Sequence, residues 1–216
     1  MKPVNARRDL LGEAVARIAA GGLLAFPTET LWGLGVDARS KAAVAKLRSW
    51  KQRGDDQPLS VLVTGADALP ALGIDPARLA RELANAFWPG PLTLVLPCRG
   101  RFAKGVARAD GALGVRCSPH PVAGVLARAL HAAGIGPITA TSLNRHGDPP
   151  ARTRAEAAHA CADGDDAPLL FVGDGLDAGG GRPSTVVDLT GAKPIVLRWG
   201  ALGRDLLLPL LRGSMK

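Results

Sequence analysis

Apolar residues recur along the chain with two different periods, and the segments that show these periods alternate. A helix is predicted where apolar side chains return every three or four positions, and a strand where a short apolar run lies between Gly, Pro or polar residues. The pattern predicts helices that begin at Asp9, Ser40, Asp75-Pro76, about Val122 and just after Thr153. It predicts strands at 23–26, 59–63, 92–96, 113–116, 138–140, 169–172, 185–189 and 195–197.

Several of these boundaries have a local signal of their own. Asp9 and Ser40 can cap the first two helices, because their side-chain oxygens accept hydrogen bonds from free backbone N–H groups. Gly21-Gly22 favours the end of the first helix. Thr153 and Glu156 have the spacing of a capping box.

The alternation of helices and strands predicts an α/β fold, a twisted mixed sheet with helices on its faces. A length of 216 residues with 47% apolar residues fits a single domain, expected over 1–216 with a core at about 8–200. Lys and Arg outnumber Asp and Glu by 27 to 19, which gives a net charge of +8. This excess favours a polyanionic partner such as a nucleotide or an RNA, although it also serves solubility.

Composition also bears on the cellular compartment. Three cysteines are too few for a disulfide framework and favour a reducing environment. No apolar run approaches the ~20 residues of a membrane-spanning helix. The first helix is interrupted by charges and therefore differs from a signal peptide. We expect a cytoplasmic protein that does not enter a membrane.

Polar residues directly follow the predicted strand at 23–26, in the segment Pro27-Thr28-Glu29-Thr30-Leu31-Trp32-Gly33-Leu34-Gly35. Open α/β sheets bind ligands at such strand ends. The segment offers hydroxyls and a carboxylate, and its glycines permit close approach of backbone N–H groups to a ligand. A strand followed by a tight turn is the simple structural interpretation of the same residues.

Two further pairs of polar residues have a spacing of two, which places side chains on one side of an extended segment. Lys51 and Arg53 can converge on a triphosphate in this way, although two cations at a helix end also suit the helix dipole. Ser142 and Asn144 follow the predicted strand at 138–140 and can contact nucleotide or phosphate oxygens. The same two residue types are common in turns.

Three more polar residues lie at the ends of predicted strands. Arg116 ends an apolar strand, and a buried arginine requires an anionic partner from the protein or from a substrate. Ser184 enters a strand in the segment Pro183-Ser184-Thr185-Val186-Val187-Asp188. Arg198 follows the last strand and adds a candidate phosphate contact.

The common catalytic signatures are absent from the sequence. It contains no Gly-x-x-x-x-Gly-Lys-Ser/Thr phosphate loop, no Gly-x-Gly-x-x-Gly after a strand, and no Gly-x-Ser-x-Gly elbow. Cys117 and His120 have the spacing of metal ligands but lack a second pair, so we expect no protein metal site.

Taken together and in this order, the polar segments resemble the YrdC/Sua5 family of L-threonylcarbamoyladenylate synthases, in its short form without the C-terminal Sua5 domain. The matching motifs are the segment 27–35, Lys51-x-Arg53, Trp88-Pro89-Gly90-Pro91-Leu92-Thr93, Val115-Arg116, Ser142-x-Asn144 and Pro183-Ser184-Thr185-Val186-Val187-Asp188. Each motif is weak alone, but six in the right order, covering most of the chain, are specific.

The resemblance implies a large basic cavity that holds ATP and L-threonine side by side. It places ATP on Lys51, Arg53, Gln57, Ser142, Asn144 and Arg198, with Lys51 and Arg53 as the catalytic residues. It places L-threonine on Thr30, Arg116 and Ser184, with Arg116 paired to the substrate carboxylate. Mg²⁺ is expected to accompany the phosphates.

The implied enzyme is a nucleotidyltransferase. Bicarbonate adds to the threonine amine, the resulting N-carboxylate attacks the α-phosphorus of ATP, and pyrophosphate leaves. Such a reaction needs positioning and charge neutralisation more than a protein base. The threonylcarbamoyl-AMP product serves the formation of N6-threonylcarbamoyladenosine in tRNA, so tRNA and the threonylcarbamoyl-transferase complex are the implied partners.

Four positions depart from the family's pattern. Leu62 stands where many long members have a histidine that faces threonine, and Gln57 where an asparagine often contacts the nucleotide. Ala112 replaces a threonine and Trp32 replaces a tyrosine. These changes affect the detailed contacts of the pocket.

Three other functions stay open. A non-catalytic protein that binds double-stranded RNA or tRNA fits the 20 arginines, but the sequence has no aromatic RNA-stacking motif and no Tyr. A carbamoyl-transfer domain like that of the hydrogenase-maturation carbamoyltransferases has the same fold, but those chains are much longer. A member of the family with different adenylation chemistry is the third.

Overall fold

The computed structural model describes residues 4–54, 57–162, 164, 166–172, 177–179 and 181–213. The helices are α1 (Val4–Ala19), α2 (Lys41–Lys51), α3 (Arg78–Phe87), α4 (Pro121–Ala132), α5 (Arg154–Ala160) and α6 (Arg204–Gly213), with short 3₁₀ turns η1 (Ala66–Ala68) and η2 (Pro70–Leu72). The strands are β1 (Leu24–Pro27), β2 (Trp32–Gly35), β3 (Ser60–Leu62), β4 (Leu92–Pro97), β5 (Ala112–Arg116), β6 (Thr141–Ser142), β7 (Leu169–Leu170), β8 (Thr185–Asp188) and β9 (Ile195–Arg198). The predicted α/β class is confirmed.

The strands form two mixed sheets instead of the one sheet that the sequence predicts. One sheet has the order β6-β2-β1-β7 and the other β3-β5-β4-β8-β9. The segment 138–140 joins them, because Ile138 bridges to Asp37 and Thr139 bridges to Val61. These contacts are isolated bridges, so the strand predicted at 138–140 is not a regular one, and the two sheets meet at this segment.

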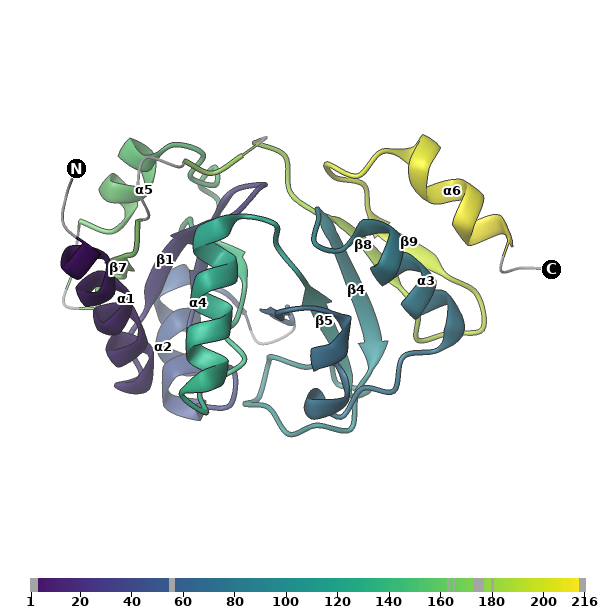
Figure 1. The fold of residues 1–216 in the computed structure, drawn as a ribbon, viewed down its shortest axis with the longest axis horizontal. Coiled ribbons are helices and arrows are strands. Elements are labelled where there is room, and N and C mark those ends of the chain that lie inside the picture. Colours follow the sequence, from purple (N-terminus) through teal and green to yellow (C-terminus); the bar gives the residue numbers. More distant parts are fainter. Residues whose placement is uncertain are drawn as a thin grey trace.

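Helices pack against each sheet and bury the apolar faces that the sequence pattern marks. Figure 1 shows α1, α2 and α4 beside the sheet that contains β1, and α3 and α6 beside the sheet that contains β8 and β9. Ile18 of α1 and Leu126 of α4 lie in one buried cluster, and Leu83 of α3 and Leu207 of α6 lie in another. Within the described ranges, no helix combines the length and the apolar character needed to cross a bilayer.

Three of the local signals are confirmed. Ser40 caps α2, since its Oγ accepts a hydrogen bond from the N–H of Ala43 at 3.2 Å. Thr153 and Glu156 form the capping box of α5. Gly21 follows α1 with a φ of 75°, the left-handed conformation that favours glycine.

Two predicted helix starts are wrong. The first helix begins at Val4, before Asp9, because the intervening alanine and arginines are good helix formers. The third helix begins at Arg78, so Pro76 lies just outside it. Helix α6 was not predicted from the sequence, because Pro209 lies inside it and disfavours a helix there.

The strand β2 was not predicted either, because its two glycines disfavour a strand. The close packing of β2 against a distant segment of the chain explains the glycine at position 35. A Cβ added at Gly35 would lie 2.5 Å from the carbonyl oxygen of Thr139 and from the side chain of Ile138. Gly35 therefore permits β2 to approach the segment that joins the two sheets.

Candidate active site

A cavity of about 560 Å³ is lined by residues from both sheets. Its size lies within the range of small-molecule sites. The polar side chains around it are hydroxyls and guanidinium groups: Thr28, Thr30, Arg53, Ser60, Thr93, Arg108, Arg116, Thr141, Ser142, Arg152, Ser184 and Arg198. Among the described residues, no Asp or Glu lines it.

Six of the nine residues that the family resemblance places on ATP and threonine line this cavity. They are Thr30, Arg53, Arg116, Ser142, Ser184 and Arg198. They come from segments that are far apart in the sequence, and the fold brings them together. Lys51, Gln57 and Asn144 are not in the lining.

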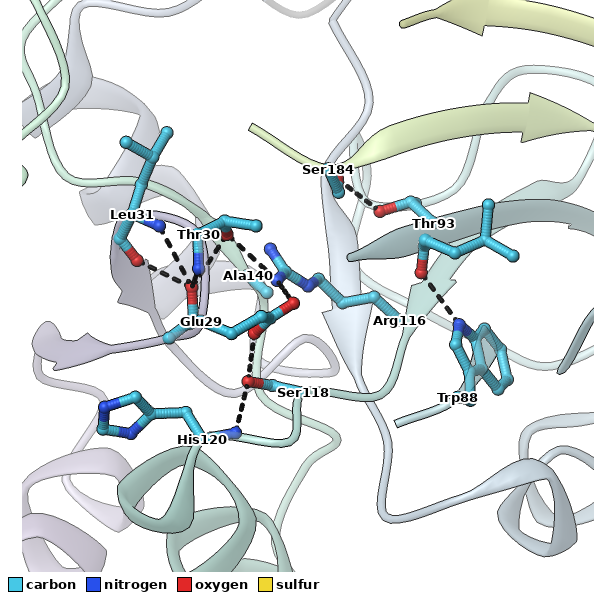
Figure 2. A network of polar contacts seen from close by, with 12 residues as sticks. Glu29, Thr30, Leu31, Trp88, Thr93, Arg116, Ser118, His120, Ala140 and Ser184 are labelled. Carbon is cyan, nitrogen blue, oxygen red and sulfur yellow. Dashed lines mark hydrogen bonds and ion pairs between the residues drawn. The ribbon is translucent and has the colours of Figure 1, made fainter. Parts of the chain in front are cut away.

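The turn between β1 and β2 presents the first of these residues. The Oγ1 of Thr28 donates a hydrogen bond to the carbonyl of Leu31 at 2.7 Å and accepts from the N–H groups of Thr30 and Leu31. These bonds turn the chain back from β1 into β2. The turn directs the side chains of Glu29 and Thr30 toward β5 (Figure 2).

Arg116, at the end of β5, is buried against this turn. Its Nη2 donates to Oε1 of Glu29 at 2.6 Å and to Oγ1 of Thr30 at 3.1 Å. The hydroxyl of Ser118 donates to the other carboxylate oxygen of Glu29 (Figure 2). The Nε of Arg116 is buried and has no hydrogen-bond partner among the described residues. The protein therefore supplies one carboxylate to Arg116 and leaves a donor of the guanidinium unused.

Ser184 directly precedes β8 of the other sheet. Its hydroxyl is 2.8 Å from Oγ1 of Thr93, as Figure 2 shows, and it accepts a hydrogen bond from Nη2 of Arg198 at 3.2 Å. Burial, and then the positive charge of Arg116, lower the pKa of Arg198. Two cations thus act on one region of the cavity, which favours the binding of an anion there.

The motif at 88–93 positions the strand that carries Thr93. The Nε1 of Trp88 donates to the carbonyl of Leu92 at 2.8 Å, and the N–H of Gly90 donates to the carbonyl of Cys117 at 2.8 Å. These contacts tie the start of β4 to the end of β5. Of this motif, Thr93 lines the cavity, and the contacts of Trp88 and Gly90 hold its strand in position.

Lys51 lies behind the cavity and holds the segment that carries Ser142. Its Nζ donates to the carbonyl of Ser142 at 2.6 Å, and to the carbonyl and Oδ1 of Asn144 at 2.9 and 3.1 Å. Asn144 Oδ1 also accepts from Ser142 Oγ at 2.6 Å. Lys51 and Asn144 therefore fix the position of Ser142 through direct bonds.

Arg53 reaches the cavity because α2 ends in a left-handed residue. Gln52 has a φ of 54°, after which the guanidinium of Arg53 donates to Oγ1 of Thr141 at 3.2 Å. It also donates to the carbonyls of Gln57 and Pro58. The side chain of Gln57 is exposed outside the lining, so this residue contributes its backbone to the site.

The remaining departures from the family pattern occupy different environments. Ala112 and Trp32 both line the cavity, and Trp32 is otherwise fully buried. Leu62 is buried in the apolar cluster of α4.

Cys117 and His120, the two residues with the spacing of metal ligands, have structural contacts of their own. Cys117 contacts the carbonyl of Thr64, and His120 caps α4.

Arg108 and Arg152 are lining residues that sequence reasoning missed. Arg108 is bound by Asp110 and Asp188, at 2.6 Å from each, and stabilises the chain around β8. Arg152 follows two prolines, and no spacing pattern marks it as part of a site. Only the fold places these two arginines at the cavity.

The buried pair of Glu29 and Arg116 should contribute strongly to stability. We expect Glu29→Gln to lower the free energy of unfolding by about 3 kcal/mol, because it leaves a buried guanidinium without a carboxylate. Glu82→Gln is a matched control, since it breaks an exposed pair with Arg78 and should cost less than about 1 kcal/mol. Urea unfolding of both variants measures the two changes, and equal losses would contradict the prediction.

Lys51 should give stability a distinct pH dependence. Burial, and to a lesser degree the charge of Arg53, lower its pKa from 10.5 to about 7. Above pH 7 the unfolded chain keeps a proton on Lys51 that the native protein releases, so native stability rises with pH until the unfolded-state pKa is reached. The stability difference between wild type and Lys51→Met should grow in favour of wild type by up to about 1.4 kcal/mol per pH unit.

Urea unfolding at pH 7.5 and 9 tests this dependence. Lys46→Met is the control on the same helix, because Lys46 is partly exposed and pairs with Asp166 at the surface. Its stability difference from wild type should stay constant over this interval. If the stability difference between Lys51→Met and wild type also stayed constant over this interval, burial would not lower the pKa of Lys51, and the prediction would be contradicted.

The fold and the site together define a mixed α/β protein in which two sheets line a cavity of arginines and hydroxyl groups. A model for the Sua5/YciO/YrdC family, described as "Telomere recombination", matches residues 16–200. The chain belongs to this family.

Named relatives and solved structures agree with this membership. The threonylcarbamoyl-AMP synthase of Chromohalobacter salexigens is 42% identical over 183 residues, which cover 84% of this chain and 93% of that protein. The crystal structure of P. abyssi Sua5 complexed with L-threonine has a TM-score of 0.81 at 31% identity, and the match covers 95% of this chain and 58% of that one. E. coli YciO has a TM-score of 0.76 at 23% identity, with 93% of both chains covered, and shows the same fold.

Proposed function

We propose that the cavity forms threonylcarbamoyl-AMP and pyrophosphate from L-threonine, bicarbonate and ATP. The observation that carries this proposal is the convergence of Arg53, Arg116 and Ser142 on one cavity from distant parts of the chain. The relatives named threonylcarbamoyl-AMP synthase support the activity, and the complex of P. abyssi Sua5 with L-threonine supports the amino acid.

L-Threonine would bind between the two sheets. Its carboxylate would pair with the guanidinium of Arg116, and its hydroxyl would lie near Thr30 and Ser184, whose side chains already form hydrogen bonds in this region. Glu29 holds Arg116 in place through their ion pair. A substrate that carries both a carboxylate and a hydroxyl satisfies groups of both kinds.

ATP would bind beside threonine, on the side of Arg53 and Ser142. Arg53 neutralises phosphate charge, and Ser142 contacts a phosphate or nucleoside oxygen. Lys51 and Asn144 hold Ser142 from behind, and Arg198 adds positive charge where the two sites meet. The N-carboxylate, formed from threonine and bicarbonate with loss of water, would then face the α-phosphorus, and arginines would stabilise the charge that develops as pyrophosphate leaves.

The described residues offer no cluster of ligands for a metal ion. They contain no group of three or more His, Cys, Asp or Glu that could hold a metal ion. Glu29, which lies between the lining residues Thr28 and Thr30, is already bound by Arg116 and Ser118. We propose that Mg²⁺ arrives coordinated to the phosphates of ATP, and we assign no step of the protein's chemistry to it.

The product would be consumed in tRNA modification. Threonylcarbamoyl-AMP is a mixed anhydride, and a transferase complex acting on tRNA is the acceptor system that we propose, in the cytoplasm. The three free cysteines fit a reducing compartment. Simple RNA binding is not favoured as the whole function, because it would not require the buried arrangement of Thr30, Arg116 and Ser184.

A reaction with omitted substrates tests the proposal. The protein is incubated with ATP, L-threonine and bicarbonate, and pyrophosphate is measured in the complete mixture and with each substrate left out. We expect pyrophosphate only when all three are present. Release that does not depend on threonine, or no release at all, would contradict the proposed activity.

A further inference from the structure

His120 has a second contact that its role as the cap of α4 does not explain. The residue is buried, and its Nδ1 accepts a hydrogen bond from the N–H of Val122 at 3.3 Å. On the other side of the ring, Nε2 lies 3.2 Å from the carbonyl oxygen of Asp177. Because a carbonyl only accepts, Nε2 must donate, and the ring is the neutral tautomer with its proton on Nε2. His120 therefore joins the start of α4 to the segment 177–179.

This segment and the residue Gly181 hold the turn between β1 and β2. The N–H of Gly179 donates to the carbonyl of Thr28 at 2.9 Å. The N–H of Gly181, which lines the cavity, donates to the carbonyl of Thr30 at 3.0 Å. A Cβ added at Gly179 would lie 2.6 Å from the carbonyl oxygen of Glu29, so a glycine is needed for this close contact. Two backbone bonds and one close contact thus fix the turn from this side.

His120 also reaches the turn from the side of β5. Its backbone N–H donates to Oγ of Ser118 at 3.2 Å, and Ser118 donates to the carboxylate of Glu29, as Figure 2 shows. The other oxygen of that carboxylate accepts from Arg116. His120 is therefore bonded to both supports of the turn, to Ser118 through its backbone and to Asp177 through its ring.

We propose that His120 is a positioning residue for the amino-acid part of the site. Its ring fixes the segment 177–179, and this backbone keeps Thr30 where threonine would bind. The role rests on the proposed function, because it acts through the threonine site. His120 is outside the lining of the cavity, so it acts through the turn and does not touch the substrate. Loss of one hydrogen bond of this kind should weaken threonine binding about five-fold.

Two substitutions separate the two contacts of the ring. In His120→Asn, the side-chain oxygen takes the position of Nδ1 and keeps the helix cap, but the side chain is too short to reach Asp177. In His120→Gln, the amide nitrogen takes the position of Nε2 and can donate to Asp177, while the helix loses a good cap. We expect His120→Asn to bind threonine about five-fold more weakly than wild type, and His120→Gln to bind it as wild type does.

Three measurements on these variants test the proposal. Calorimetric titration should show weaker threonine binding in His120→Asn alone and unchanged ATP binding in both variants. Urea unfolding should show a loss of stability in His120→Gln alone, because only this variant lacks the cap. Amide hydrogen exchange at Gly179 and Gly181 should become about five-fold faster in His120→Asn and stay as in wild type in His120→Gln. His131→Asn is the matched control, since His131 is exposed in the last turn of the same helix, and it should match wild type throughout.

The outcomes separate this inference from the proposed function. If His120→Asn binds threonine as wild type does, or if its amides at Gly179 and Gly181 exchange no faster, the positioning role is overturned and the proposed function stands. If His120→Gln loses as much threonine affinity as His120→Asn, the contact with Asp177 is not the cause, and the role is overturned as well. If wild type binds no threonine, the proposed function fails and this role fails with it.

Discussion

Replacement of Arg116 by alanine is expected to abolish threonine-dependent pyrophosphate formation while ATP binding persists. Arg116 is buried, lines the cavity, and is held in place by its ion pair with Glu29. Truncation of a buried partner of a carboxylate costs 2–5 kcal/mol, so kcat/KM for threonine should fall on the order of 10²–10³-fold. Initial rates over a range of threonine concentrations, with calorimetric ATP binding, measure both effects.

This variant needs a second one, because it leaves the carboxylate of Glu29 buried without its cation. The double variant Arg116→Ala/Glu29→Gln removes the unpaired charge and should recover part of the lost stability. It should still fail to use threonine. Recovery of threonine saturation in the double variant would mean that Arg116 acts on stability alone and does not bind the substrate.

Replacement of Arg53 by alanine is expected to weaken ATP binding by on the order of 10²-fold, because it removes a guanidinium of the cavity that donates to Thr141, the residue before Ser142. Threonine binding should change much less, since we assign threonine to Arg116 and Thr30, which are bonded to each other. Calorimetric titration of the variant with ATP and with threonine measures this difference.

Arg53 also holds the carbonyls of Gln57 and Pro58, so its loss affects the backbone. Arg53→Lys keeps the charge and should retain part of the ATP affinity, while Arg81→Ala, an exposed change on α3, should retain all of it. Thermal unfolding of each variant separates a local effect from loss of the fold. Unchanged ATP affinity in folded Arg53→Ala would remove this residue from the phosphate site.

The sequence predicted the elements whose signals are local. Ser40 and the pair of Thr153 and Glu156 act on neighbouring backbone, so their caps appear as predicted. Strand β2 depends on Gly35, whose missing Cβ matters only because Ile138 lies against it, about a hundred residues later in the chain. Such a contact has no local signal.

The same distinction applies to the site. The motifs gave residues that face one cavity, including Arg53, Arg116 and Ser142. They did not show that Lys51 points at backbone carbonyls, because the direction of a side chain at a helix end depends on what packs beside it. Nor did they show Arg152, which has no motif and reaches the cavity through the pairing of Ala151 with β2.

The most direct measurement is a crystal structure of the protein with L-threonine and a non-hydrolysable analogue of ATP. We predict that both ligands occupy the cavity of about 560 Å³, with the threonine carboxylate on Arg116 and the phosphates along Arg53 and Ser142. A structure with either ligand outside this cavity, or with threonine bound away from Arg116, would contradict the shared site on which the proposed reaction depends.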